Sequence, residues 1–133
     1  MPDSENYRKG AALRQQLMGG YAEKMNQTVY SDPMMQQFRD LSAEAIFGTM
    51  WTRPGLDFKS KALAVVAADV ATAADEITIH LRIALNQGWT EQELAEAILL
   101  LTGYVGAPRV RQALLRAKDV FEEVRAQRTR SGS

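Results

Sequence analysis

The sequence contains one histidine, His80, and a glutamate, Glu76, lies four residues before it. On a helix, residues i and i+4 share a face, so the Glu76 carboxylate is placed to reach the imidazole ring. Histidine has an ordinary pKa of about 6.5 and is well suited to moving protons at neutral pH. A neighbouring carboxylate would hold its tautomer and stabilise its cationic form. The spacing is typical either of a proton-transfer pair or of a weak surface ion pair.

Other kinds of chemistry find little support in the sequence. There is no second histidine to complete a metal site that begins on this helix, so we expect no metal. The absence of cysteine excludes disulfides, redox dithiols and cysteine nucleophiles. No glycine-rich phosphate loop and no nucleophile elbow is present.

Four further residues are candidates for a site. Asp69 interrupts the most apolar stretch of the chain; it is either an active-site acid or, more commonly for a buried carboxylate, the partner of an arginine on another helix. Trp51 and Arg53 flank a predicted turn, where Arg53 would hold a substrate carboxylate through two hydrogen bonds. The alternative is a packed tryptophan beside a solvated arginine. Tyr104 is either a hydroxyl donor in a pocket or a core aromatic.

Helices are expected to position all of these residues, since helical periodicity dominates and no alternating strand pattern occurs. The predicted fold is all-α, a compact bundle of about six helices in one domain (residues 1–133, core about 7–124). A disordered tail is expected at 127–133. The predicted helices cover residues 4–26 (weakened at Gly19 and Gly20), a segment starting at 32–33 and ending before the turn at 51–55, an apolar segment around 63–71, residues 75–87, a segment starting at the 90–93 capping box, and residues 109–126.

The composition argues against two classes of partner, nucleic acids and membranes. Sixteen basic residues balance sixteen acidic ones, so no net positive charge attracts nucleic acid. The longest apolar stretch, residues 62–74, is shorter than the roughly 20 residues of a membrane span. The first six residues are polar and acidic, unlike a signal peptide, so a cytoplasmic protein is expected. The methionines are interpreted as filling the core or subunit contacts.

Four segments, in this order, resemble the carboxymuconolactone decarboxylase family: WTRPGL at 51–56, EITIH at 76–80, ALNQGWTEQE at 84–93 and YVGAP at 104–108. The resemblance extends over residues 7–124 and implies an alkylhydroperoxidase-D-like fold. In that superfamily the peroxidases carry a C-x-x-C-x-x-x-H run on this helix. Here Ala73 and Glu76 occupy the cysteine positions and His80 the histidine position, which excludes dithiol peroxidase activity.

The resemblance implies a cofactor-independent decarboxylase that acts on a carboxylated lactone or a similar activated acid, in aromatic compound catabolism. Carbon dioxide loss from such a substrate leaves an extended enolate, so no cofactor is needed as an electron sink. By resemblance, His80 is the proton donor or oxyanion partner and Glu76 its orienting or exchanging partner. Arg53 would anchor the substrate, with Trp51 and Tyr104 also lining its site. Assembly into a homo-trimer or hexamer is implied as well.

Three departures from the family pattern weaken the prediction of a diacid substrate. Ala73 stands where an arginine is often found, Lys61 replaces an arginine early in the central helix, and Leu100 replaces a polar residue. Two alternatives therefore stay open. One is a proton-transfer isomerase or cyclase in a specialised biosynthetic pathway, and the other is a non-catalytic protein that binds a small acid or a partner protein.

Overall fold

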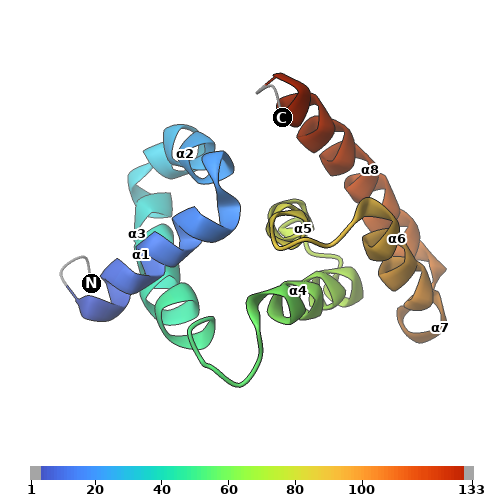
Figure 1. Cartoon of the computed structure of the whole chain (residues 1–133), viewed down its shortest axis with the longest axis horizontal. Helices are drawn as coiled ribbons and strands as arrows, with labels where there is room; N and C mark the ends of the chain where they lie inside the picture. The colour runs from blue at the N-terminus through green and yellow to red at the C-terminus, as the bar shows by residue number, and fades with distance from the viewer. Residues whose placement is uncertain (1–3, 131–133) are drawn as a thin grey trace. The chain divides into compact units, whose positions relative to one another are not determined.

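The computed structural model describes residues 4–130, which are helical nearly throughout and contain no strand. The predicted all-α class is therefore confirmed. The chain forms two compact units, one up to Phe58 and one from Lys59 onward. Figure 1 shows their helices in chain order. The first unit contains α1 (Glu5–Met18), α2 (Gly20–Gln27), the 3₁₀ turn η1 (Val29–Ser31), α3 (Pro33–Ser42) and the π-helical segment η2 (Ala43–Met50). The second contains α4 (Phe58–Thr72), α5 (Ile77–Asn86), α6 (Glu91–Leu100), the single turn α7 (Thr102–Val105) and α8 (Ala107–Arg130).

The helix expected over residues 4–26 is two helices, because the chain breaks at Gly19. This glycine has φ 61° and ψ −141°, a backbone conformation that residues with a side chain rarely adopt. The expected start of the next long helix is confirmed. The Asp32 side chain accepts a hydrogen bond from the backbone N–H of Met35, and Pro33 occupies the first helical turn, where its missing donor does no harm.

Within the first unit, α1 crosses η2 at very close range (Figure 1). A Cβ atom on Gly10 would lie 1.6 Å from the carbonyl oxygen of Ala43, and one on Gly48 would lie 2.1 Å from the carbonyl oxygen of Asn6. Only glycine fits at these two positions. Several large apolar side chains of this unit are exposed, at Met34, Phe38, Leu41, Ile46 and Met50.

The second unit has a core of aliphatic side chains, several of them fully buried. The predicted capping box at the start of α6 is confirmed, with reciprocal hydrogen bonds of 3.0 Å between Thr90 and Glu93. The tail prediction is wrong for residues 127–130, which continue α8, and its remainder, 131–133, lies outside the described residues. The core side chains are Val66, Val70, Leu81, Ile83, Leu94, Ile98 and Val120.

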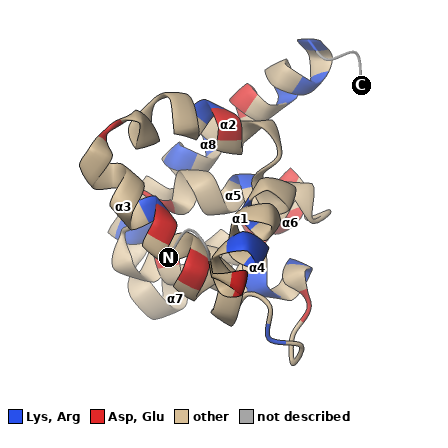
Figure 2. Cartoon of the chain, turned by 90° about the vertical axis from the view of Figure 1, so that its left-hand side faces the viewer, with Lys and Arg blue, Asp and Glu red and all other residues tan. Residues whose placement is uncertain are grey.

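The charged residues are mixed in sign in both units. Figure 2 shows lysine and arginine positions interspersed with aspartate and glutamate positions along the helices. None of the helices in residues 4–130 combines the length and apolar character that crossing a membrane requires.

Candidate active site

The imidazole of His80 contacts a carboxylate, and that carboxylate belongs to Asp69. The distance between Nδ1 of His80 and Oδ2 of Asp69 is 2.5 Å. The Asp69 side chain is 10% exposed and the His80 side chain 23% exposed, so the contact is largely shielded from water. This contact engages Nδ1 of the ring and leaves Nε2 for a reactant.

The turn between α4 and α5 positions this pair. Asp69 lies in the last turn of α4 and His80 in the first turn of α5. The turn is a Schellman motif, in which the N–H of Ala74 donates to the carbonyl of Asp69 and the N–H of Ala73 donates to that of Val70. Ala73 adopts φ 55°, the left-handed conformation that glycine normally supplies at this point. The backbone is therefore strained directly beside the candidate site.

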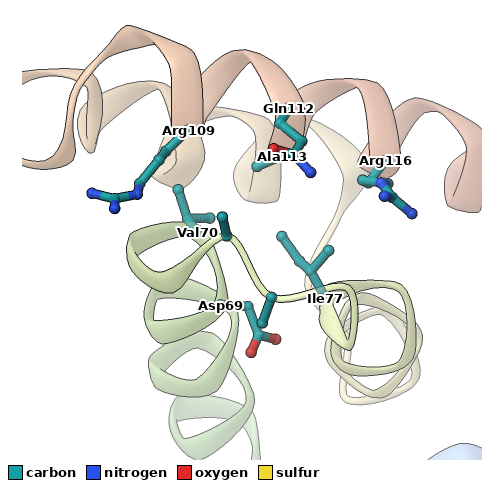
Figure 3. A pocket seen from close by; sticks show the side chains of 9 residues that line it. Asp69, Val70, Ile77, Arg109, Gln112, Ala113 and Arg116 are labelled. Atoms are coloured by element: carbon teal, nitrogen blue, oxygen red, sulfur yellow. The ribbon is translucent and has the colours of Figure 1, made fainter.

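Of the two alternatives for Asp69, pairing with an arginine is wrong. A small pocket beside Asp69 is lined by Arg109, Gln112 and Arg116 of α8. Figure 3 shows the two arginines extending in opposite directions along α8, while the Asp69 carboxylate points away from that helix. Arg116 instead forms an ion pair of 2.8 Å with Asp75. The enclosed part of the pocket, about 10 Å³, holds roughly one water molecule and is too small for a lactone.

Glu76 lies one turn before His80, as expected, and its carbonyl accepts the backbone N–H of His80 at 3.1 Å. Its side chain is exposed at the N-cap of α5 and makes no side-chain hydrogen bond within residues 4–130. The expected contact between the Glu76 carboxylate and the imidazole is thus replaced by the contact from Asp69. Glu76 is left open to solvent and to any molecule that binds there.

The other predicted site residues occupy different surroundings. Trp51 is buried in the first unit, stacked on Phe47 at 6.0 Å between ring centroids and tilted against Phe58. Arg53 is exposed in the turn that follows it. In the second unit, Tyr104 is 78% exposed on α7. Tyr104 makes no hydrogen bond or ring contact with His80 within residues 4–130.

Sequence reasoning named Asp69 but did not predict its contact with His80. The signal was available: an aspartate inside an apolar helix, followed across one predicted turn by the only histidine of the chain. A buried carboxylate requires a partner, and the nearest residue able to supply a positive charge across that turn is His80. No three histidine, aspartate or glutamate side chains in residues 4–130 gather in a way that would hold a metal ion.

Comparison with known proteins agrees with the resemblance drawn from the motifs. The model of the carboxymuconolactone decarboxylase family matches residues 36–119. The chain is 30% identical over 126 residues to the 4-carboxymuconolactone decarboxylase of Acinetobacter baylyi, covering 93% of this chain and 92% of that protein. It is 32% identical over 118 residues to the nitrosuccinic acid decarboxylase of Metarhizium robertsii, covering 87% and 81%.

A third relative is an uncharacterised 15.0 kDa protein encoded in the nqo9–nqo10 intergenic region of Paracoccus denitrificans. It is 34% identical over 83 residues, which cover 60% of this chain and 62% of that protein. The family model spans both units and includes Asp69, Glu76 and His80. With a family match over more than half of its length, this chain belongs to the carboxymuconolactone decarboxylase family.

Proposed function

We propose that this chain is a cofactor-independent carboxy-lyase acting on a carboxylated lactone or a similarly activated acid. Two relatives named as decarboxylases support the reaction class. The observation that carries the proposal is the 2.5 Å contact between His80 and Asp69, which orients the only imidazole of the chain. An imidazole held in this way is prepared to move a proton through Nε2.

In the proposed reaction the substrate itself accepts the electron pair, so no cofactor is needed as an electron sink. Breaking the bond to the carboxylate releases carbon dioxide and leaves the electron pair on carbon, delocalised into the lactone carbonyl as an extended enolate. The Nε2–H of cationic His80 then donates a proton to carbon, and the ring recovers a proton from water. In nitrosuccinic acid the nitro group would accept the same electron pair. The shared requirement is a carboxylate next to a group that stabilises a carbanion.

Each residue has a proposed role in this scheme. Asp69 holds the ring in one orientation and stabilises the imidazolium form that donates the proton. Glu76 exchanges protons with substrate or water. Arg53 remains the proposed anchor for a substrate acid group, with Trp51 and Tyr104 at the substrate site, and aromatic compound catabolism in the cytoplasm remains the proposed setting.

We also propose that the protein is a homo-oligomer, a trimer or a hexamer. The exposed apolar side chains on α3 and η2 support this, because monomeric proteins seldom expose large contiguous apolar patches. Light scattering in solution measures the mass directly.

The test is carbon dioxide release from 4-carboxymuconolactone and, separately, from nitrosuccinate. The wild-type protein should release carbon dioxide from at least one of them. His80→Ala should reduce kcat by about 10²–10⁴-fold, the usual contribution of a placed acid, and Glu76→Gln by a smaller factor. Circular dichroism checks that both variants fold.

Absence of release from both substrates by folded wild-type protein would refute the proposed reaction on them. Deuterium incorporation into a substrate without carbon dioxide loss would point to the isomerase alternative.

A further inference from the structure

The first unit contains a polar pocket that the proposed lyase chemistry does not use. It has a volume of about 250 Å³, slightly below the range of about 300–1,000 Å³ common for ligand pockets. Side chains from α1, α2 and α3 supply its polar lining. These side chains are Tyr7, Arg14, Gln15, Asn26 and Arg39.

Arg14 is the central feature of this pocket. It is only 7% exposed, and its Nη2 atom is buried without a hydrogen-bond partner within the described chain. Its Nη1 atom makes one long hydrogen bond, 3.4 Å, to Oδ1 of Asn26. The guanidinium lies over the ring of Tyr30, with Cζ 5.1 Å from the ring centroid. The buried Nη2 group is thus left without an acceptor for its N–H donors among residues 4–130.

No carboxylate of residues 4–130 neutralises this buried charge through an ion pair. Asp40, the carboxylate bonded to two of the lining residues, is already engaged: it accepts from the Tyr7 hydroxyl at 3.3 Å and from Arg39 at 3.4 Å. Burial, and then the neighbouring Arg39, lower the pKa of Arg14 from its ordinary value, while Tyr30 acts in the opposite direction. Both effects describe a cation held in surroundings that disfavour it.

We propose that this pocket binds a small carboxylate anion, with Arg14 as the principal ligand and Arg39 as a second cationic donor. The planar guanidinium fork matches a carboxylate through two parallel hydrogen bonds. The side-chain amides of Gln15 and Asn26 supply further N–H donors around the same space. The volume admits a small organic acid and excludes a nucleotide-sized ligand. The site is built from the first unit alone and requires neither Asp69 nor His80.

Titration calorimetry with succinate, acetate and inorganic phosphate, on the full chain, tests this site. Succinate or acetate should bind saturably at up to millimolar concentrations. Arg14→Met should weaken that binding by at least about tenfold, as expected from loss of charge-assisted hydrogen bonds, and Arg39→Gln by less. Arg111→Gln, an exposed arginine of α8, is the matched control for charge and should bind as the wild type does. His80→Ala should also bind normally, which separates this site from the proposed lyase.

A second readout covers the case in which Arg14→Met does not fold. In the wild-type protein, the Nε–Hε resonance of Arg14 in ¹H–¹⁵N spectra should shift on titration with succinate, and that of Arg111 should not. Absence of saturable carboxylate binding would overturn the proposal, as would unchanged affinity in Arg14→Met. Binding of phosphate alone would overturn the assignment to carboxylates.

Discussion

Arg14 in the first unit and Arg82 in the second are equally buried, each 7% exposed, yet their surroundings differ. Arg82 donates through Nη2 to the Glu123 carboxylate at 2.5 Å. Arg14 has an amide oxygen and an aromatic ring beside it and no ion pair within the described residues. A buried charge is costly unless it is paired. Where the fold supplies a carboxylate, as for Arg82, the buried arginine stabilises the structure. Where the fold supplies none, as for Arg14, the guanidinium can bind an anion from solution.

Asp69 extends the comparison to a negative charge. Together with the two arginines it completes the set of buried charged residues in 4–130, and its partner is His80. Both buried charged residues of the second unit, Asp69 and Arg82, therefore have a partner within that unit. The two pairs differ because a histidine can gain and lose a proton near neutral pH, whereas a carboxylate paired with an arginine only holds the guanidinium in place.

After His80→Ala, the largest expected effect comes from removing the carboxylate that orients His80. Asp69→Ala should lower kcat by about 10²-fold or more with little change in KM, since it removes orientation and stabilisation of the imidazolium and leaves substrate binding intact. Asp69→Asn should be at least as harmful, because its amide can donate to Nδ1 and favour the wrong tautomer. Steady-state kinetics across pH measure this.

Asp119→Asn is the control for that experiment, since Asp119 is exposed on α8. If the Asp69 variants fold and keep wild-type kcat, the contact between Asp69 and His80 is structural. The Asp69–His80 and Arg82–Glu123 pairs would then not differ in function.

A smaller effect is expected from making Arg82 resemble Arg14. Glu123→Gln leaves the buried guanidinium with a neutral partner and should cost about 1–2 kcal/mol, reduced from a fully buried pair because the Glu123 side chain is 60% exposed. Arg14→Met, by contrast, should leave the free energy of unfolding within about 1 kcal/mol of wild type or raise it. Urea denaturation gives both values.

Glu122→Gln is the matched control, because Glu122 is exposed and pairs with Lys118 on the same helix. A large loss in Arg14→Met, equal to or above that in Glu123→Gln, would show that Arg14 stabilises the fold and would remove the contrast between the two arginines.

The smallest effect is expected at the strained turn that positions Asp69 and His80. Ala73→Gly should raise the free energy of unfolding by about 0.5–1 kcal/mol, because glycine adopts φ 55° without steric penalty. Ala64→Gly, at an exposed position inside α4, should instead lower it by about 1 kcal/mol. Thermal or urea denaturation distinguishes the two signs, and a loss of stability in Ala73→Gly would contradict the assignment of strain.

Much of the local structure could be predicted from the sequence because its signals are local. The Thr90–Glu93 capping box, the start at Asp32 and Pro33, and the all-helical class each depend on residues within one or two turns of each other. The family could be predicted for a similar reason, since its motifs are short segments in a fixed order.

The break at Gly19 and the extension of α8 to Arg130 were harder to place. Glycine and exposed polar residues are compatible with several backbone states, so helix ends at such positions depend on packing.

The sequence by itself determined the helices, the family, and the presence of one histidine near two carboxylates, Glu76 and Asp69. Spacing favoured Glu76 as the partner of His80, because i and i+4 proximity is visible along the chain. Only the tertiary structure showed that Asp69 is the partner of His80 and that Arg14 has no carboxylate partner within residues 4–130. The physical reason is the same for both residues. A buried charge is compensated by whichever group the fold brings close to it, and that group lies on another helix. Separation along the sequence does not show which groups on other helices lie close in space.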